Sequence, residues 1–378
     1  MTGGRGPRVA LVHDWLTGMR GGEKVLEALC GLFPGASVFT MVHVRGTVSP
    51  AIERLGPHGS LLSRLPGVAR YYRQLLPVFP FIIEQFDVDE FDLVISSSHC
   101  AAKSVVAPRR ARHLCYCFTP MRYAWDQFEW YFGPERVGRL THLMRPAMRC
   151  LARWDRETAG RPNRYVANSQ YVAGRIGRYY NRRSAAVVYP PVDTEFYTPA
   201  RADEGDEDYY LVVSALVPYK RLEVAIEACA RAGRRLKVVG DGPEAARLRQ
   251  LAGSTVEFLG SVSDAEVRRQ YRGARAVLLP GEEDFGIVPV EAQACGRPVV
   301  ALGRGGTCET VVDGRTGVLV EAPTGEAFAA GIASLERLAL DPQAIRAHAV
   351  RFSRERFSHE FMAQAEQLLA APDAQIRW

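Results

Sequence analysis

The sequence predicts an α/β protein of two domains, each a doubly wound parallel sheet with helices on both faces. Three observations support this fold class. The chain has 378 residues, which is too many for one ordinary domain and enough for two. Short apolar runs alternate along it with segments of helical length, as in strand–helix–strand units. The runs are apolar on both faces, as strands buried within a parallel sheet are.

The first domain is predicted to span residues 1–192. It opens with a short strand at 9–12, a Gly-rich loop and a helix from about Glu23 to Leu32. Further apolar runs, each followed by polar loop residues, predict strands at 37–42, 93–96, 114–117 and 165–167. The domain ends where two prolines, at 190 and 191, follow a strand-like segment at 185–188.

The second domain is predicted at 193–350 and alternates more regularly. Its strands are expected at 210–213, 236–239, 256–258, 276–279, 299–301 and 318–320. Helices are expected between them, at 222–232, 244–251, 264–272 and 288–295. The tail is helical from about Ala344 to Ala371, and residues 351–378 are predicted to form a C-terminal helix that crosses back to the first domain.

Composition is typical of a globular enzyme, with 24% charged and 47% apolar residues. We find no apolar stretch long enough for a membrane span and no apolar leader after Met1, so no secretory signal is expected. Eight cysteines without a Cys-x-x-Cys pair favour reduced thiols. The sequence therefore predicts a cytoplasmic protein.

Charge is distributed unevenly along the chain. Residues 1–200 hold 26 Lys and Arg against 16 Asp and Glu, a balance of +10, and the remaining 22 against 26 give −4. A basic half beside an acidic half indicates that one domain meets something anionic, such as phosphates or a lipid surface. We find no nucleic-acid-binding motif, so nucleic acid is not predicted as a partner.

The strongest site signal runs from Glu283 to Val299, from a predicted strand into a helix whose backbone N–H groups favour an anion. It contains Glu283 and Glu291, separated by seven residues. Glu283 is placed to meet a sugar at the loop, and Glu291 to reach a ribose diol, because a carboxylate accepts hydrogen bonds from two hydroxyls. Two glutamates alone would more often be surface charges, so the assignment depends on the surrounding string.

That string, Glu-Asp-Phe-Gly-Ile-Val-Pro-Val-Glu, resembles the Glu-x7-Glu signature of family 4 retaining glycosyltransferases with the GT-B fold. Three other segments are similar in order and spacing, namely 19–24, 213–221 and 303–317. Residues 96–99 and 115–126 are similar to mannosyltransferases of surface-polysaccharide assembly. The resemblance implies two Rossmann-like domains facing across a cleft, with the acceptor on the first and a nucleotide-sugar donor on the second.

The resemblance also implies roles for individual residues. His99, Lys220 and Glu283 match catalytic positions, and His99 is expected to touch the transferred sugar. The implied donor-binding residues are Gly21, Gly22, Arg221, Val262, Asp284, Phe285, Gly286, Ile287, Val288 and Glu291. Two positions depart from the family pattern: Ala215 stands where an arginine is common, and Phe118 where a histidine is. Arg221 is a candidate to compensate for the first.

The residue types at these positions suit the chemistry. Gly21 and Gly22 lack Cβ atoms, so their backbone is expected to approach a diphosphate closely and to adopt positive φ angles. Lys220 and Arg221 are placed to neutralise the charge that grows on the leaving diphosphate, usually a large catalytic effect. No His/Cys cluster has metal-binding spacing, and Asp87-Val88-Asp89 is interpreted as a solvated loop. Neither a metal nor another cofactor is predicted.

The donor and acceptor follow from resemblance only. GDP-mannose is favoured over a UDP-hexose, and the acceptor is expected to be a glycan or a polyprenyl-diphosphate-linked sugar in cell-surface polysaccharide synthesis. Segments 64–81 and 136–156 mix arginines with apolar and aromatic residues, which suits an anionic membrane surface on the inner face of the plasma membrane. Arg70, Arg73, Arg145 and Arg149 are the candidate contacts. A core-packed helix with a solvated basic face is the alternative.

Other functions share parts of this pattern. A nicotinamide-dependent dehydrogenase would carry Gly-x-Gly-x-x-Gly after its first strand; that motif is absent there, and 240–243 holds only half of it. A noncatalytic nucleotide-sugar-binding protein stays open because of Ala215 and Phe118. A nucleotide-sugar epimerase of the same fold also stays open, since an epimerase differs by needing no acceptor.

Overall fold

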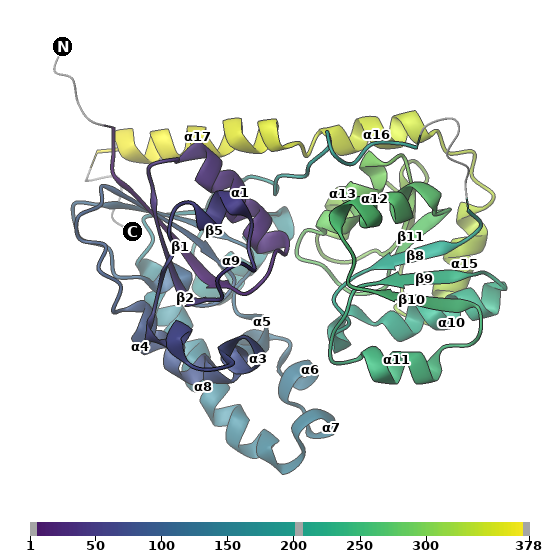
Figure 1. The fold of residues 1–378 in the computed structure, drawn as a ribbon, viewed down its shortest axis with the longest axis horizontal. Helices are drawn as coiled ribbons and strands as arrows, with labels where there is room; N and C mark the ends of the chain where they lie inside the picture. The colour runs from purple at the N-terminus through teal and green to yellow at the C-terminus, as the bar shows by residue number, and fades with distance from the viewer. Residues whose placement is uncertain (1–5, 201–206, 373–378) are drawn as a thin grey trace. The chain divides into compact units, whose positions relative to one another are not determined.

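The structure is a computed structural model that describes residues 6–200 and 207–372. The chain divides into two compact units (Figure 1). The first contains the described residues up to Pro191 together with the segment from Phe357 onward, and the second contains Val192–Arg356. Within the described ranges, no helix is long and apolar enough to cross a membrane.

The first unit is built on a parallel sheet of seven strands, counted over the described residues, in the order β3-β2-β1-β4-β5-β6-β7. The strands are β1 Val9–Leu16, β2 Ser37–His43, β3 His58–Gly59, β4 Leu93–Ser98, β5 Arg112–Cys117, β6 Arg164–Ala167 and β7 Ser184–Val187. All the pairs are parallel. Their carboxyl ends therefore share one edge of the sheet, which is where α/β sheets place ligands.

Helices cover both faces of this sheet. On one face, α1 (Gly21–Leu32) and α17 (Arg354–Ala370) share a core, where Phe357 and Phe361 of α17 pack with Leu26 of α1 (Figure 1). Those two phenylalanines are four residues apart, so they lie on one side of the helix. The other face is covered by the segment from 61 to 83 and by α8 (Thr141–Glu157).

The remaining helical elements of the first unit are short, and α9 is the longest of them. They are α2 Pro50–Glu53, α3 Val68–Tyr71, α4 Phe79–Ile83, α5 Arg122–Trp125, α6 Phe128–Phe132, α7 Pro134–Val137 and α9 Gln170–Tyr180, with 3-10 turns η1 Leu61–Arg64, η2 Tyr72–Val78, η3 Ala102–Ser104, η4 Gly138–Leu140 and η5 Thr158–Gly160.

The second unit repeats the architecture with six parallel strands among its described residues, in the order β10-β9-β8-β11-β12-β13. They are β8 Tyr210–Val213, β9 Leu236–Val239, β10 Val256–Gly260, β11 Ala276–Leu279, β12 Val299–Leu302 and β13 Gly317–Val320. The helical elements are η6 Pro218–Lys220, α10 Leu222–Ala232, α11 Ala245–Leu251, α12 Asp264–Gly273, α13 Ile287–Ala294, α14 Thr307–Thr310, α15 Gly325–Leu335 and α16 Pro342–Val350.

The predicted fold class, two doubly wound α/β domains, is confirmed. Two differences from the sequence prediction matter for the site and the tail. β1 continues past residue 12 to Leu16, because its polar residues His13 and Asp14 are buried as fully as its apolar ones. The tail, predicted as helical from about 344 to 371, consists of two helices, α16 and α17, separated by a turn at 351–353.

His113 in β5 is a buried histidine held neutral by its surroundings. Its Nε2 lies 2.8 Å from Ser96 Oγ on the neighbouring strand β4. Burial lowers the pKa of His113 to about 3, and the positive charges of Lys103 and Arg161 act in the same direction. The neutral ring is therefore part of the folded state, whereas an unfolded chain would protonate it below about pH 6.5.

We predict that His113 makes the protein less stable in acid. Because its folded pKa lies below the unfolded value, the stability that it contributes is complete above about pH 6.5 and is lost as the pH falls toward 3. At pH 5 the loss is about 2 kcal/mol. Equilibrium unfolding at pH 7.5 and pH 5 should show a smaller drop for His113→Gln than for the wild type. His359→Gln, at an exposed histidine, is the control. Equal drops in all three proteins would contradict the assignment.

Candidate active site

At the carboxyl edge of the first sheet, Asp14 fixes the loop that follows β4. Its carboxylate is fully buried and accepts four backbone N–H hydrogen bonds, from His99, Cys100, Ala101 and Ala102, at 2.7 to 2.9 Å. Four N–H donors converging on one carboxylate balance the cost of burying its charge. The backbone at 99–102 is therefore held to β1 by a single side chain.

The same carboxylate orients the imidazole of His99. His99 Nδ1 lies 3.1 Å from Asp14 Oδ2, and the ring of Trp15 packs edge-on against it with 4.4 Å between centroids. An ionised carboxylate only accepts, so Nδ1 carries the proton and Nε2 of the neutral ring is the acceptor nitrogen. The His99 side chain is 28% exposed, so substrate can reach it.

The sequence predicted His99 but missed Asp14. A signal for Asp14 was present, because an acidic residue lies two positions after the apolar run 9–12 and precedes a Gly-rich loop. Polar residues at the carboxyl ends of parallel strands lie where ligands bind. The structure assigns Asp14 to β1 and turns it toward the loop after β4.

His13 lies beside Asp14 and His99 and packs beneath the first turn of α1. Its Nδ1 is 2.8 Å from Ser97 Oγ, and burial lowers the pKa of its imidazole to about 4. Nε2 of His13 is buried with no hydrogen-bond partner among the described residues. The ring of Phe118, at the position where the family often has histidine, packs against the rings of both His13 and His99, with centroids 6.3 and 6.1 Å away.

Gly21 and Gly22 open α1, and the prediction of positive φ angles for them is wrong. That conformation belongs to Gly18, with φ +149°. The small residue at 22 is instead explained by packing, because a Cβ there would lie 3.4 Å from Cε1 of His13. The contact of Gly21 and Gly22 with a diphosphate stays a prediction.

Glu23 adds a titratable group to the first turn of α1. Its carboxylate accepts a 3.1 Å hydrogen bond from the backbone N–H of Arg20, which caps the helix. Burial is the largest effect on it and raises the pKa of Glu23 to about 7. The charge at this turn therefore changes near neutral pH.

In the second unit, loops at the carboxyl edge of the sheet pack closely at glycines, where there is no side chain to keep the backbones apart. A Cβ on Gly281, after β11, would lie 2.8 Å from Cα of Lys220. A Cβ on Gly306, after β12, would overlap the backbone at Phe285. The N–H of Gly306 donates a 2.8 Å hydrogen bond to the carbonyl of Glu283. These contacts fix Lys220 and Glu283 in adjacent loops.

The structure brings Lys220 and Glu283 together as an ion pair, with side chains that are 18% and 15% exposed. Both charges are therefore partly withdrawn from water while one side of each stays accessible. Arg221 takes a left-handed conformation, φ 55°, before α10. Its guanidinium donates to Glu223 at 2.9 Å and to the carbonyl of Pro323 at 3.2 Å. Arg221 is thus already engaged within the unit, which weakens its candidacy to replace an arginine at 215.

Two predicted donor-binding side chains point into the second unit. Glu291, on α13, is 5% exposed and accepts a 3.0 Å hydrogen bond from the hydroxyl of Tyr271. Phe285 is 3% exposed, and its ring packs against Phe352 at 5.6 Å. Any donor contact of Phe285 is therefore left to its backbone.

The other predicted donor-binding residues lie at the start of α13 or after β10. Gly286, with φ +90°, is the N-cap of α13. Asp284, Ile287 and Val288 around it are half-buried, and so is Val262 in the loop after β10. No group of three or more His, Cys, Asp or Glu side chains that could hold a metal ion occurs in the part of the chain that the structure describes.

The second unit is similar to a known protein family. Residues 193–351 match the family model described as "Glycosyl transferases group 1". Curated relatives include the D-inositol 3-phosphate glycosyltransferases of Segniliparus rotundus, 36% identical over 57% of this chain and 53% of the relative, and of Geodermatophilus obscurus, 35% identical over 60% and 58%. The chain thus spans just over half the length of these relatives.

Solved structures with the same fold cover nearly the whole chain. Anabaena Alr3699/HepE, solved in complex with UDP-glucose, superposes with a TM-score of 0.70 at 20% identity, over 95% of this chain and 99% of that one. Sucrose-phosphate synthase of Thermosynechococcus elongatus gives 0.68 at 16% identity, over 97% and 100%. At these identities the likeness shows the fold, and the GT-B fold class expected from the sequence is confirmed.

Proposed function

We propose that this chain transfers a hexose from a nucleotide sugar to an acceptor hydroxyl, with retention of configuration at the anomeric carbon. The observation that carries the proposal is the Lys220–Glu283 ion pair at the carboxyl edge of the second sheet, within the segment that matches the glycosyl transferase model. A nucleotide sugar has a diphosphate directly beside a ring of hydroxyls. A cation next to a carboxylate fits that combination of groups.

Lys220 acts on the leaving group in this mechanism. Its ammonium has three donor positions, and Glu283 uses one of them. In the proposed complex the ammonium also donates to a diphosphate oxygen, where negative charge grows as the bond to the anomeric carbon breaks. Because the Lys220 side chain is largely buried, this interaction is stronger than it would be in water.

Glu283 positions the sugar in this mechanism, because its carboxylate accepts hydrogen bonds from sugar hydroxyls. The contact of His99 with the transferred sugar stays a prediction from the resemblance. With Nδ1 committed to Asp14, Nε2 is the nitrogen of His99 that would accept from a hydroxyl. The acceptor oxygen forms its bond on the face that the phosphate leaves. Its proton passes to the departing phosphate oxygen, so the products are the glycoside and a nucleoside diphosphate. All atoms and protons of this reaction are accounted for without an enzyme nucleophile and without a metal ion.

Two donors are candidates. GDP-mannose is favoured by the resemblance of residues 96–99 and 115–126 to polysaccharide mannosyltransferases. UDP-glucose is the second, because Anabaena Alr3699/HepE, which shares the fold, was solved with it. The proposed acceptor is a glycan or a polyprenyl-diphosphate-linked sugar of the cell surface.

A thermal-shift panel of nucleotides and nucleotide sugars tests the function. A ligand that binds the folded protein raises its melting temperature by mass action, and 100-fold saturation stabilises by about 2.7 kcal/mol. The stabilising nucleotide sugar is then assayed for transfer, with and without EDTA. We expect one donor to stabilise and to be consumed only with acceptor present, equally in both buffers. Donor conversion without an acceptor would indicate an epimerase, and activity that EDTA abolishes and manganese restores would contradict the metal-free mechanism.

Substitution of Glu283 and substitution of Glu291 should change different properties, kcat in the first case and nucleotide affinity in the second. Glu283→Gln should lower kcat by about ten-fold or more, because it removes charged hydrogen bonds to the sugar, while nucleoside diphosphate affinity stays unchanged. Glu291→Gln should weaken the donor and the free nucleotide alike. Tyr271→Phe is the matched control, because it removes the partner of Glu291 but keeps the carboxylate. Calorimetry that finds wild-type nucleotide affinity in Glu291→Gln would remove its ribose role.

We also propose that the first unit works on an anionic membrane surface. Of the thirteen large apolar side chains that the described residues expose, seven lie in the segments 61–81 and 130–143. They are Leu61, Leu65, Val78, Phe81, Trp130, Leu140 and Leu143. The first of these segments packs on a core cluster through Phe79. The second continues into α8, which packs on the same cluster through Met148, so both lie on the same face of the sheet (Figure 1).

The charge around these side chains suits anionic lipid. Residues 61–83 contain Arg64, Arg70 and Arg73 and no acidic residue. Each arginine near anionic lipid contributes about 1 kcal/mol. Of the predicted contacts, Arg145 is ion-paired with Glu129 at 2.8 Å, so it contributes less than Arg149, which is also exposed.

Vesicle flotation checks this proposal. The wild type should float with phosphatidylglycerol vesicles at low salt and less at high salt, since exposed charges are screened beyond about 10 Å at 0.1 M. Phe81→Glu with Leu143→Glu should abolish flotation. Leu251→Glu with Leu338→Glu, at exposed positions of the second unit, should leave it intact. A wild type that stays in the soluble fraction at low salt would indicate a soluble acceptor.

A further inference from the structure

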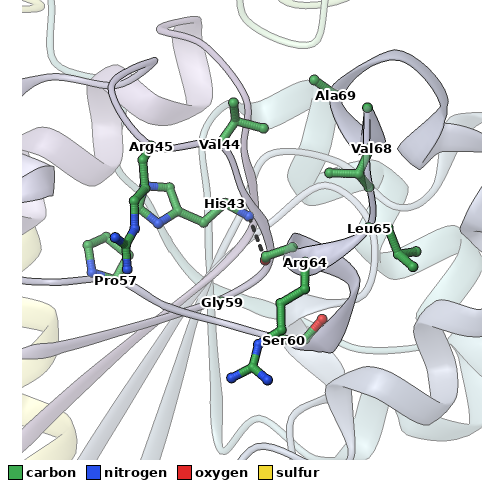
Figure 2. A pocket seen from close by; sticks show the side chains of 12 residues that line it. His43, Val44, Arg45, Pro57, Gly59, Ser60, Arg64, Leu65, Val68 and Ala69 are labelled. Atoms are coloured by element: carbon green, nitrogen blue, oxygen red, sulfur yellow. Dashed lines mark hydrogen bonds between the residues drawn. The ribbon is translucent and has the colours of Figure 1, made fainter.

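A cavity of about 520 Å³ lies in the first unit between the end of β2 and the turn of η1 (Figure 2). Its lining includes His43, Arg45, Ser60, Ser63, Arg64 and Val68. The volume is within the range of pockets that hold small molecules. No residue predicted from the sequence to bind donor or to act in catalysis lines it.

The walls of the cavity are fixed by hydrogen bonds. The N–H of His43 donates to Ser63 Oγ at 3.0 Å, and the hydroxyl of Ser60 donates to the carbonyl of Met41 at 2.6 Å. Glu53 accepts a 2.7 Å hydrogen bond from the N–H of Gly46, and its carboxylate lies 3.2 Å from His43 Nε2. A pocket whose walls are held in this way needs little reordering to bind a ligand.

Two guanidinium groups at the cavity have no partner in the described parts of the chain. Arg45 extends beside the ring of His43 toward Pro57, and Arg64 extends past Ser60 (Figure 2). Among the described residues, neither guanidinium makes a hydrogen bond or an ion pair. The only acidic residue between positions 43 and 69 is Glu53, and His43 and Gly46 already engage it. The cavity therefore has an uncompensated positive charge.

We propose that this cavity binds the phosphate group of a phosphorylated small molecule through Arg45 and Arg64. Guanidinium groups bind phosphate with paired, charge-assisted hydrogen bonds. Ser63 adds a hydroxyl, because its oxygen accepts from His43 and its own proton is available to donate. Val68 and Leu65 give the cavity an apolar wall against which the body of the ligand packs.

The position of the cavity assigns the ligand to the acceptor, a step that rests on the proposed transfer reaction and makes a phosphorylated sugar a third acceptor class beside the glycan and the lipid-linked sugar. Residue His43 pairs with Leu16 of β1, and β1 lies between β2 and β4, which leads into His99. The ends of β2 and β4 are two strand spacings apart, about 10 Å. Both loops leave the same edge of the sheet. A sugar phosphate bound in the cavity can thus direct a hydroxyl toward His99.

Calorimetry with glucose 6-phosphate, inorganic phosphate and glucose tests the anion site. We expect glucose 6-phosphate and phosphate to bind and glucose not to. Arg45→Gln with Arg64→Gln should weaken binding by more than about ten-fold, since each removes charged hydrogen bonds. Arg54→Gln is the matched control, because Arg54 is an exposed arginine of the same segment that does not line the cavity. Melting temperatures confirm that each variant is folded.

The outcomes separate this proposal from the proposed function. No binding, or equal binding to the double variant and the wild type, overturns the anion site, whatever the nucleotide-sugar panel shows. Retention on phosphatidic acid vesicles without binding of soluble phosphates also overturns it. Phosphate binding that depends on Arg45 and Arg64 supports it even if no nucleotide sugar binds. Nucleotide binding to the double variant should equal that of the wild type.

Discussion

The buried carboxylate of Asp14 is the interaction on which the first unit's site depends. A lone buried charge would cost several kcal/mol, and four backbone N–H groups and one imidazole offset that cost. Those partners come from the loop after β4, so the charge fixes that loop, the tautomer of His99 and the packing of Trp15. Trp15 in turn packs on Tyr72 at 5.1 Å, which links the site to the segment that forms the cavity wall.

In the second unit, the site residues are held in place by loops that pack closely at glycines. The Lys220–Glu283 pair joins the loops after β8 and β11, which approach closely because residue 281 has no Cβ, and the loop after β12 packs on the second of them because residue 306 has none. A side chain at 281 would push the first two loops apart, and the ammonium would lose the carboxylate. Arg221 adds strain, since a non-glycine residue at φ 55° is uncommon. Strained or crowded backbone of this kind persists where surrounding contacts over-determine it.

The sequence predicted the sheets well, because buried parallel strands such as β8 and β11 are short, uniformly apolar and bounded by polar loops. It missed the end of β1, since His13 and Asp14 break the apolar run and their burial depends on Ser97 and the loop after β4. It identified Lys220 and Glu283 through motif resemblance. The sequence alone did not show that Glu291 faces Tyr271, because the partner of a helix residue depends on which elements pack against that side of the helix.

The charge asymmetry of the chain explains where an anionic partner belongs. Some of the basic residues in the first unit are paired internally: Lys103 lies 3.0 Å from Asp155 in the core, and Arg175 pairs with Asp126. Such pairs hold elements together and offer no net charge to a ligand. Arg45 and Arg64 differ, because neither has a carboxylate partner among the described residues and a cavity whose lining contains no acid lies beside them. An excess of +10 over residues 1–200 therefore says little by itself. An anionic partner binds where the fold leaves Lys and Arg side chains without a carboxylate.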